Sequence, residues 1–369
     1  MKINIFGDFV CQLDKLPVID ETIIRYIEHA DLNIVNFEAP ICTEDSSPIE
    51  KSGPALRQVI GAPSYLESTG FNVITVANNH FMDYGEDAAI ESMSSFKKAQ
   101  LLGAGYGENA YKPLIVEECG LKVGFISLTH FEFGTLSDEN CGAKKFGTAW
   151  INSSMVDSIV KQTSEQVDFL IVLPHAGIEN ITQPLPEWRS RYRQFIDLGA
   201  DLVIASHPHI IQGSEVYKGK DIFYSLGNFF FPWLGADAVP NTWYNGMSVQ
   251  LEITQSGIKT TPFFTKFTND IISIDEDSGL SLFVESSNVL KNNKEYEVTI
   301  SKECKDLLPL YYDLFYYSGY VKIGVGQWLK KCLKIILNRT KTSNTHIINN
   351  LRCESHRYAI IRALESNMK

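Results

Sequence analysis

The chain lacks the sequence features of several protein classes. No stretch of its 369 residues reaches the roughly 18 uninterrupted apolar residues that a membrane-spanning helix requires. Its first residues show no apolar segment with a cleavage site, so we expect no secretory signal. Positive charge is scarce as well: 33 Lys and Arg against 44 Asp and Glu give a net charge of −11, which argues against nucleic-acid binding by the body of the protein.

Cysteine forms no recognisable pattern either. The seven cysteines are scattered, odd in number and never spaced as Cys-x-x-Cys, which argues against a disulfide framework and against a zinc ribbon. We therefore expect reduced thiols and a cytoplasmic location. The apolar fraction of 44% and charged fraction of 21% are ordinary for a globular protein, and the length allows one large domain with an appendage or two modest domains.

Short apolar runs, each followed closely by Gly, Asp, Asn or His, predict strands that are buried on both faces. They cover residues 3–6, 32–35, 73–76, 123–128, 169–173 and 202–205. Helical patterns lie between them, at 21–29, 85–100, 153–166 and 188–198, and Gly199 is placed to end the last helix. This alternation predicts an α/β architecture with largely parallel strands, in which functional residues collect at the carboxyl ends of the strands.

The pattern changes in the last third of the chain. Residues 221–225, 247–254 and 259–267 read as successive antiparallel strands. Beyond residue 268 this rhythm is lost, and an aromatic-rich helical stretch is expected from 303 to 320. We therefore predict a domain over residues 1–270 and a mainly helical extension over 271–369.

Acidic, amide and imidazole side chains follow the predicted strands. Asn36 and Glu38 share one side of an extended backbone. Pro208 disfavours helical backbone at His207, so an extended segment 207–209 would place both of its imidazoles on one side. The candidate metal ligands are six residues: Asp8, Glu38, Asn79, His175, His207 and His209.

Each of these residues taken singly has an ordinary alternative, such as a turn Asp, a surface Glu or a turn Asn. Together, their mixed nitrogen and oxygen donors suit Mn, Fe or Zn. Two such metals a few ångström apart can stabilise both the attacking and the leaving oxygen of a hydrolytic reaction. His80, beside Asn79, can act as a general acid toward a leaving group. Nucleophilic catalysis by Ser or Cys has weaker support, because Ser206 and Ser225 lack a recognisable nucleophile elbow.

At these residues the chain resembles the CapA (poly-γ-glutamate capsule biosynthesis) family of the calcineurin-like metallophosphatase superfamily. The resemblance covers residues 1 to about 255 and rests on several motifs in family order. They are Gly7-Asp8, Asn36-Phe37-Glu38, Ala77-Asn78-Asn79-His80 with Asp83, His175-Ala176-Gly177-Ile178-Glu179, His207-Pro208-His209 and Tyr224-Ser225-Leu226-Gly227-Asn228-Phe229.

The resemblance implies a two-sheet sandwich flanked by helices, with a dinuclear metal site at one sheet edge. It implies that Asp8 and His209 hold one metal, that Asn79, His175 and His207 hold the other, and that Glu38 bridges the two. His80 would be the acid beside the substrate. Asn36, Asp83, Glu179 and Asn228 are candidates to contact the substrate or to support the ligands.

One departure concerns the first strand. The superfamily normally has Asp-x-His there, whereas this chain has Asp8-Phe9-Val10, which has no imidazole. One metal would therefore lose a ligand and be held more weakly.

Residues 319–341 form a basic segment in an otherwise acidic chain. They contain six Lys or Arg and no acid, with apolar residues between the charges. A basic amphipathic helix can lie on an anionic membrane surface, here the inner face of the membrane. The alternative, which we favour, is a helix that packs its apolar side on the domain.

These observations favour a metal-dependent hydrolase that acts on a small-molecule or polymer substrate, with phosphoesters slightly ahead of amides. The resemblance suggests a capsule, polyglutamate or other cell-surface polymer pathway. The alternative is a non-catalytic binding or assembly factor that retains the fold. The sequence does not determine the oligomeric state.

Overall fold

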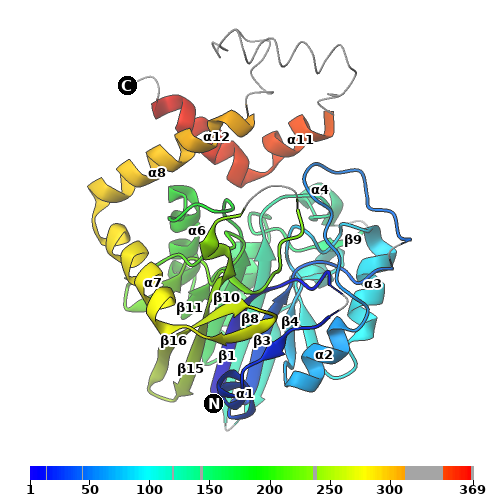
Figure 1. Ribbon diagram of the computed structural model, residues 1–369. Helices are drawn as coiled ribbons and strands as arrows, with labels where there is room; N and C mark the ends of the chain where they lie inside the picture. Colours follow the sequence, from blue (N-terminus) through cyan, green and yellow to red (C-terminus); the bar gives the residue numbers. More distant parts are fainter. Residues whose placement is uncertain are drawn as a thin grey trace.

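Two β-sheets pack face to face and are flanked by helices (Figure 1). The computed structural model describes residues 1–13, 15–43, 45–118, 120–141, 144–235, 239–311 and 344–366. The predicted α/β sandwich with a helical C-terminal end is confirmed.

The first sheet has the order β2-β17-β16-β15-β1-β3-β4-β5, and β14 also pairs with β1. Strands β1, β3, β4 and β5 run parallel, whereas β15, β16 and β17 form an antiparallel meander. The strand bounds are β1 (Lys2–Phe9), β2 (Val18–Ile19), β3 (Leu32–Phe37), β4 (Val73–Thr75), β5 (Gln100–Leu102), β14 (Asn228–Phe230), β15 (Asn245–Thr254), β16 (Gly257–Thr268) and β17 (Ile271–Ile274).

The second sheet has the order β12-β13-β11-β10-β8-β7, with parallel central strands and antiparallel edges. Its strands are β7 (Leu114–Glu118), β8 (Leu121–Thr129), β10 (Phe169–His175), β11 (Leu202–Ile204), β12 (Ser214–Tyr217) and β13 (Lys220–Phe223). A separate small pair joins β6 (Ala104–Tyr106) to β9 (Phe146–Thr148).

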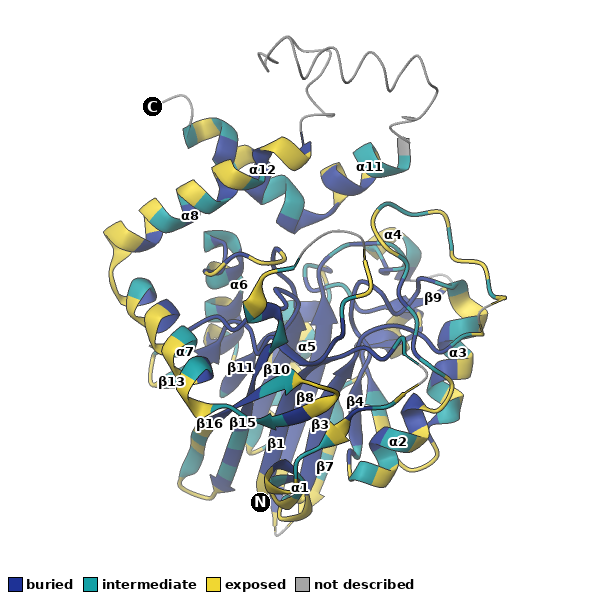
Figure 2. Ribbon diagram, in the orientation of Figure 1, coloured by how far each residue is buried: buried dark blue, intermediate teal, exposed yellow. Residues whose placement is uncertain are grey.

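Alternating side chains along the strands build three apolar layers. Ile34 of β3 and Ile171 of β10 point into the layer between the sheets. Their neighbours Val35 and Val172 point outward, onto the helices that cover each sheet. The central strands are accordingly buried, while the edge strands and the outer sides of the covering helices are partly exposed (Figure 2).

The helices fall into three groups. Helices α1 (Glu21–Glu28), α2 (Ala62–Thr69) and α3 (Gly85–Ser95) cover the first sheet, and α5 (Val156–Ser164) and α6 (Pro186–Asp197) cover the second. Gly199, with φ 110°, follows the end of α6, as predicted. The remaining helices are α4 (Asp138–Cys141), α7 (Glu276–Lys291), α8 (Asn293–Leu307), α11 (Asn344–Arg352) and α12 (Glu354–Ser366).

Two sequence predictions need correction. The helix predicted over 85–100 was wrong in its last five residues: α3 ends at Ser95, and Gln100–Leu102 forms β5, paired with β4 at the sheet edge. The extension already becomes helical at Glu276, ahead of the stretch predicted over 303–320, of which residues 312–320 lie outside the described residues. The domain boundary at 270 stays a prediction, although β17 (Ile271–Ile274) still pairs with β16 of the first sheet.

Helices α8, α11 and α12 lie beyond the end of the sheets at which β8 and β10 finish (Figure 1). The basic segment 319–341 lies outside the described residues, so its contact with a membrane stays a prediction. No helix in the described part of the chain is long and apolar enough to cross a membrane. The cytoplasmic location also stays a prediction.

Candidate metal centre

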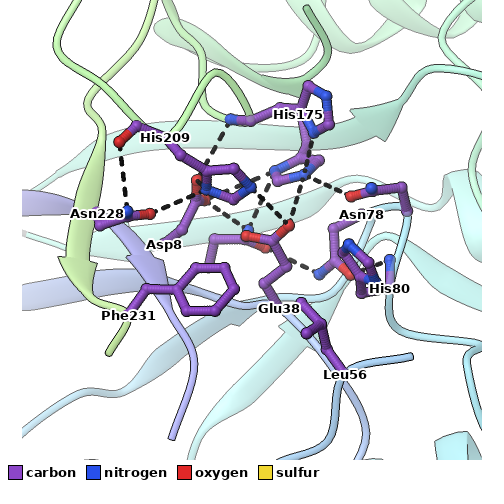
Figure 3. Close-up of polar contacts among 12 residues, drawn as sticks. Asp8, Glu38, Leu56, Asn78, His80, His175, His209, Asn228 and Phe231 are labelled. Carbon is purple, nitrogen blue, oxygen red and sulfur yellow. Dashed lines mark hydrogen bonds and ion pairs between the residues drawn. The ribbon is translucent and has the colours of Figure 1, made fainter. Parts of the chain in front are cut away.

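The candidate ligands come from strand ends of both sheets. Asp8 lies near the end of β1 and pairs in register with Asn36 of β3 and Asn228 of β14. His175 ends β10, and the loop after β11 carries His207. Because the carboxyl ends of these parallel strands meet at one edge of the sandwich, residues far apart in sequence converge there (Figure 3).

Asp8 is fully buried and contacts groups from three elements. Its Oδ1 accepts a hydrogen bond from Asn36 Nδ2 (2.8 Å), and its Oδ2 accepts one from the His207 backbone N–H (3.3 Å). His175 Nδ1 lies 3.6 Å from Oδ1, and His209 Nδ1 lies 3.4 Å from Oδ2. Burial alone would raise the pKa of Asp8, but its contacts with His175 and His209 hold that pKa well below the usual range. Asp8 is therefore ionised and can supply a carboxylate oxygen as a metal ligand.

Glu38 lies between the imidazole rings of His175 and His209. It is fully buried, and neither of its carboxylate oxygens accepts a hydrogen bond from any described residue. Oε1 lies 3.3 Å from His175 Nε2 and 3.7 Å from His209 Nε2. A buried carboxylate without hydrogen-bond donors is costly unless a cation compensates it, so this residue fits a metal ligand.

Asn79, His175 and His207 form one cluster of donors. His175 Nε2 lies 3.0 Å from Asn79 Oδ1 and 3.2 Å from His207 Nδ1. All three side chains are buried. An amide oxygen and two imidazole nitrogens at these separations can converge on one divalent ion.

His209 is oriented by Asn228. The Asn228 amide nitrogen donates to the backbone oxygens of His209 (3.3 Å) and Trp243 (3.0 Å), which turns Oδ1 toward His209 Nδ1 at 2.9 Å. When Nδ1–H donates to this oxygen, Nε2 keeps its lone pair on the side of Glu38. The orientation suits His209 to a metal on the Asp8 side of Glu38.

Strained backbone surrounds these ligands. Ala39, directly after Glu38, has φ 148°, and His207 has φ 103°. His209, at φ 59°, is also in the left-handed region. The extended backbone predicted for 207–209 was therefore wrong, because the loop after β11 turns sharply to bring both imidazoles to Glu38. Such conformations cost about 1–3 kcal/mol each and cluster at functional sites.

The charges of the site favour a cation. Burial alone would lower the pKa of His175 and of His209, but the Glu38 and Asp8 carboxylates together outweigh burial. They raise these pKa values to about 9 and about 10. Burial keeps the pKa of His207 well below its usual range. The two buried carboxylates therefore stabilise positive charge between the sheets.

His80 belongs to a separate buried triad with Asp83 and Lys51. His80 Nδ1 lies 2.6 Å from Asp83 Oδ2 and 3.2 Å from Lys51 Nζ. Lys51 donates to Asp83 Oδ1, and the Leu56 backbone N–H donates to Asp83 Oδ2 (2.8 Å). These contacts fix the carboxylate, and the shorter contact assigns the Nδ1 proton of His80 to it. The Nε2 atom remains for a substrate.

A cavity of about 480 Å³ opens beside the triad and the ligands. His80 and His209 line it together with the aromatic side chains of Phe231 and Trp243. Glu179, which is exposed, also lines this cavity. The cavity therefore gives a substrate access to both the candidate acid and the candidate ligands.

Val10 occupies the position where the superfamily has an imidazole. It is fully buried in an apolar cluster with Ala39, Leu56, Phe231 and Trp243. The missing histidine is thus replaced by close apolar packing, and the Val10 side chain offers no donor to a metal.

The structure brings all six predicted ligands to one place, and their individual roles stay predictions. Of the four predicted supporting residues, Asn36 contacts Asp8 and His175, Asp83 contacts His80, and Asn228 contacts His209, while Glu179 lies at the cavity. The sequence reading missed Lys51, which stands in a loop with no strand-end pattern. It also missed His130, which stands two residues after the strand predicted over 123–128, as His175 does after the strand predicted over 169–173.

The sequence is similar to that of known capsule synthesis proteins. The family model described as bacterial capsule synthesis protein PGA_cap matches residues 15–232. Capsule biosynthesis protein CapA of Bacillus anthracis is 31% identical over 222 residues, covering 56% of this chain and 52% of that protein. PGA biosynthesis protein CapA of Bacillus subtilis (strain 168) is 30% identical over 219 residues, covering 57% of each. The chain spans about half the length of these curated relatives.

Among solved structures, a putative 5'-nucleotidase from Staphylococcus aureus in complex with alpha-ketoglutarate aligns with a TM-score of 0.46 and 15% identity. The alignment covers 78% of this chain and 58% of that one, and nothing about activity follows from it. The family match spans more than half of the chain and includes every candidate ligand except Asp8, whose place rests on the geometry above. The chain belongs to the bacterial capsule synthesis protein (PGA_cap) family.

Proposed function

We propose that this protein is a metal-dependent hydrolase that cleaves a phosphoester, or less favourably an amide, in a capsule, polyglutamate or other cell-surface polymer pathway. The observation that carries the proposal is the buried Glu38 carboxylate, which accepts no hydrogen bond from the described residues and lies between two groups of imidazoles. The pathway is proposed from the names of the two Bacillus relatives, of which this chain spans about half.

Two groups of residues would hold divalent metals. Asp8 and His209 form one group, Asn79, His175 and His207 form the other, and Glu38 is shared. The mixed donors suit Mn, Fe or Zn. Metals bound there would supply Lewis acidity and lower the pKa of a coordinated water.

His80 would deliver the proton to the leaving group. Asp83 accepts the Nδ1 proton, so in the imidazolium form of His80 the Nε2–H is the proton that can face a substrate in the cavity. Asp83 is itself fixed by Lys51 and by the Leu56 backbone, so the triad keeps the ring from rotating. The same arrangement can protonate the leaving group of a phosphoester or of an amide, and the substrate panel below distinguishes the two.

The test combines metal analysis with a panel of phosphomonoesters, phosphodiesters and γ-glutamyl amides. We expect divalent metal in the protein after growth with Mn, Zn and Fe, and hydrolysis of at least one phosphoester. Because a general acid contributes about 10²–10⁴-fold, His80→Ala should lower kcat by that factor and leave the metal content unchanged. His29→Ala, at the exposed C-terminal end of α1, is the matched control. Metal-free wild-type protein would refute the proposal.

A second candidate, a non-catalytic assembly factor, is favoured by Val10. Apolar packing at that position leaves one metal with fewer ligands, which weakens binding. An Asp8→Ala, His80→Ala double variant separates the two functions in cells. Normal polymer production by that variant would support the assembly factor, whereas loss of production with intact protein levels would support the hydrolase.

A further inference from the structure

A second group of potential metal ligands lies where the C-terminal helices meet the core. His130 and Glu132 follow β8, and Cys353 lies between α11 and α12. These residues are 1%, 9% and 0% exposed, respectively. One donor atom from each, an imidazole nitrogen, a carboxylate oxygen and a thiol sulfur, lies within 4.8 Å of the other two. The group shares no residue with the centre built around Glu38.

His130 is oriented with one nitrogen free. Its Nδ1 lies 2.7 Å from Ser355 Oγ, which also accepts a hydrogen bond from Trp188 Nε1 (3.0 Å). With Nδ1–H donating to this hydroxyl, Nε2 presents a lone pair. Nε2 is buried without a hydrogen-bond partner among the described residues and lies 4.0 Å from Glu132 Oε1. A buried, unpartnered imidazole nitrogen beside a carboxylate and a thiol is what a metal site provides.

His356 lies close enough to Glu132 to supply a fourth donor. Its Nε2 lies 3.6 Å from Glu132 Oε1, and its Nδ1 is occupied by the Tyr311 hydroxyl at 2.8 Å. Donor atoms of a tetrahedral zinc site lie roughly 3.3–3.8 Å apart, because zinc–ligand bonds are about 2.0–2.3 Å long. The contact between His356 and Glu132 already has this spacing.

The two segments are held in place by contacts that do not involve the proposed ligands. The Glu354 carboxylate accepts hydrogen bonds from the Phe131 backbone N–H (2.7 Å) and Asn152 Nδ2 (3.1 Å), and another from Trp150 Nε1. Glu354 is only 2% exposed. Residues on either side of it, Cys353 and Ser355, are thereby kept against the loop after β8, so the donor set is organised without an ion.

We propose that His130, Glu132, Cys353 and His356 bind one zinc ion that fastens the C-terminal helices to the core. Thiolate and imidazole donors favour zinc over manganese. Binding exchanges the S–H bond of Cys353 for a zinc–sulfur bond and releases one proton to solvent. The site adjoins the other centre, since the His130 and His207 rings lie 4.4 Å apart between centroids. Zinc here would hold His130 against His207.

Cobalt substitution of the full-length protein tests the proposal, because none of the candidate ligands around Glu38 is a cysteine. The Co²⁺-loaded wild type should show a near-ultraviolet thiolate-to-cobalt charge-transfer band. Cys353→Ser should abolish this band and lower the zinc content of protein grown with zinc by one ion per chain. Cys304→Ser is the matched control, because Cys304 is also a buried free cysteine and belongs to α8 rather than to this group. It should keep both the band and the zinc.

Two further measurements keep the result interpretable. Glu38→Gln should retain the thiolate band, which separates failure of this site from failure of the proposed hydrolytic centre. His130→Gln, which keeps the thiol, should lower zinc affinity at least tenfold. No thiolate band in the wild type, or a band that persists in Cys353→Ser, would overturn the proposal. Circular dichroism establishes that each variant is folded, and an unfolded Cys353→Ser would be replaced by His130→Gln in the band assay.

Discussion

Three histidines of this protein are each held by a neighbouring side chain that contacts one ring nitrogen and leaves the other available. Asn228 holds Nδ1 of His209, Asp83 holds Nδ1 of His80, and Ser355 holds Nδ1 of His130. In each case the second nitrogen remains for a metal or a substrate. Glu38 differs, because its oxygens lack any such partner among the described residues. This contrast makes Glu38 the residue most informative about metal binding.

Replacing Glu38 with Gln should greatly lower the affinity for metal while the protein still folds. The substitution removes the shared anionic ligand, and we expect metal affinity to fall by more than the roughly 10–100-fold seen when only an outer partner of a ligand is lost. Because a ligand that binds only the folded state raises Tm, added Mn²⁺ should raise the Tm of the wild type and barely change that of Glu38→Gln. Glu179→Gln, at the exposed rim of the cavity, should keep the full shift. Equal shifts for all three proteins would contradict a role for Glu38.

At the scale of elements, the site depends on how closely the end of β1 approaches the segment before β14. The Asp8 backbone N–H donates to Gly227 O at 3.1 Å. A Cβ added at Gly7 would stand 2.0 Å from that same oxygen. Only glycine therefore allows β1 to run beside this segment and set Asp8 between Asn36 and Asn228.

Gly7→Ala should destabilise the fold and disturb the metal centre together. Separating β1 from Gly227 is an overpacking change, which typically costs about 1–3 kcal/mol in unfolding free energy. Urea unfolding and metal titration of the same variant measure both effects. Gly61→Ala is the control, because its added Cβ would meet only Leu16 Cδ1 at 3.9 Å, and its effect should stay within about 0.5 kcal/mol. A Gly7→Ala protein with wild-type stability would show that the two segments can separate freely.

Over the whole molecule, a half-buried ion cluster ties α6 to the edge of the second sheet. The Glu215 carboxylate of β12 accepts hydrogen bonds from Arg189 and Arg193 of α6 and from the Tyr224 hydroxyl. Burial would raise the pKa of Glu215, but these hydrogen bonds outweigh it and lower the pKa to about 2 from an ordinary 4.5. The folded state thus prefers the ionised carboxylate.

Lowering the pH should therefore remove the contribution of the ionised Glu215 carboxylate to the free energy of unfolding. Because the pKa is lower in the folded state, the contribution of Glu215 is complete above pH 4.5 and is lost as the pH falls toward about 2. Glu215→Gln should be less stable than the wild type near neutral pH, and the difference should shrink over this window. Urea unfolding at several pH values measures it. Glu252→Gln, which breaks an exposed pair with Lys259, should leave the pH dependence unchanged, and a constant difference for Glu215→Gln would contradict the assignment.

The sequence by itself determined the strand–helix alternation and the placement of Asp8, His175 and His207 near strand ends. Those features follow from local periodicity, which each segment shows by itself, and from the general rule that functional residues collect at the carboxyl ends of parallel strands. The ends of elements were less well determined. Helix α3 ends at Ser95, because the Glu67 carboxylate accepts the backbone N–H groups of residues 97–99, which a continued helix would use.

Only the tertiary structure decided which side chains meet beyond the six ligands that the family resemblance placed together. Lys51 reaches Asp83 from a loop with no periodic pattern, and His130 meets Ser355 across 225 residues of sequence. The positive φ of His207 is likewise imposed by the loop after β11 rather than by local preference. Contacts of this kind depend on the packing of distant elements, and packing leaves no trace in the local pattern of a single chain.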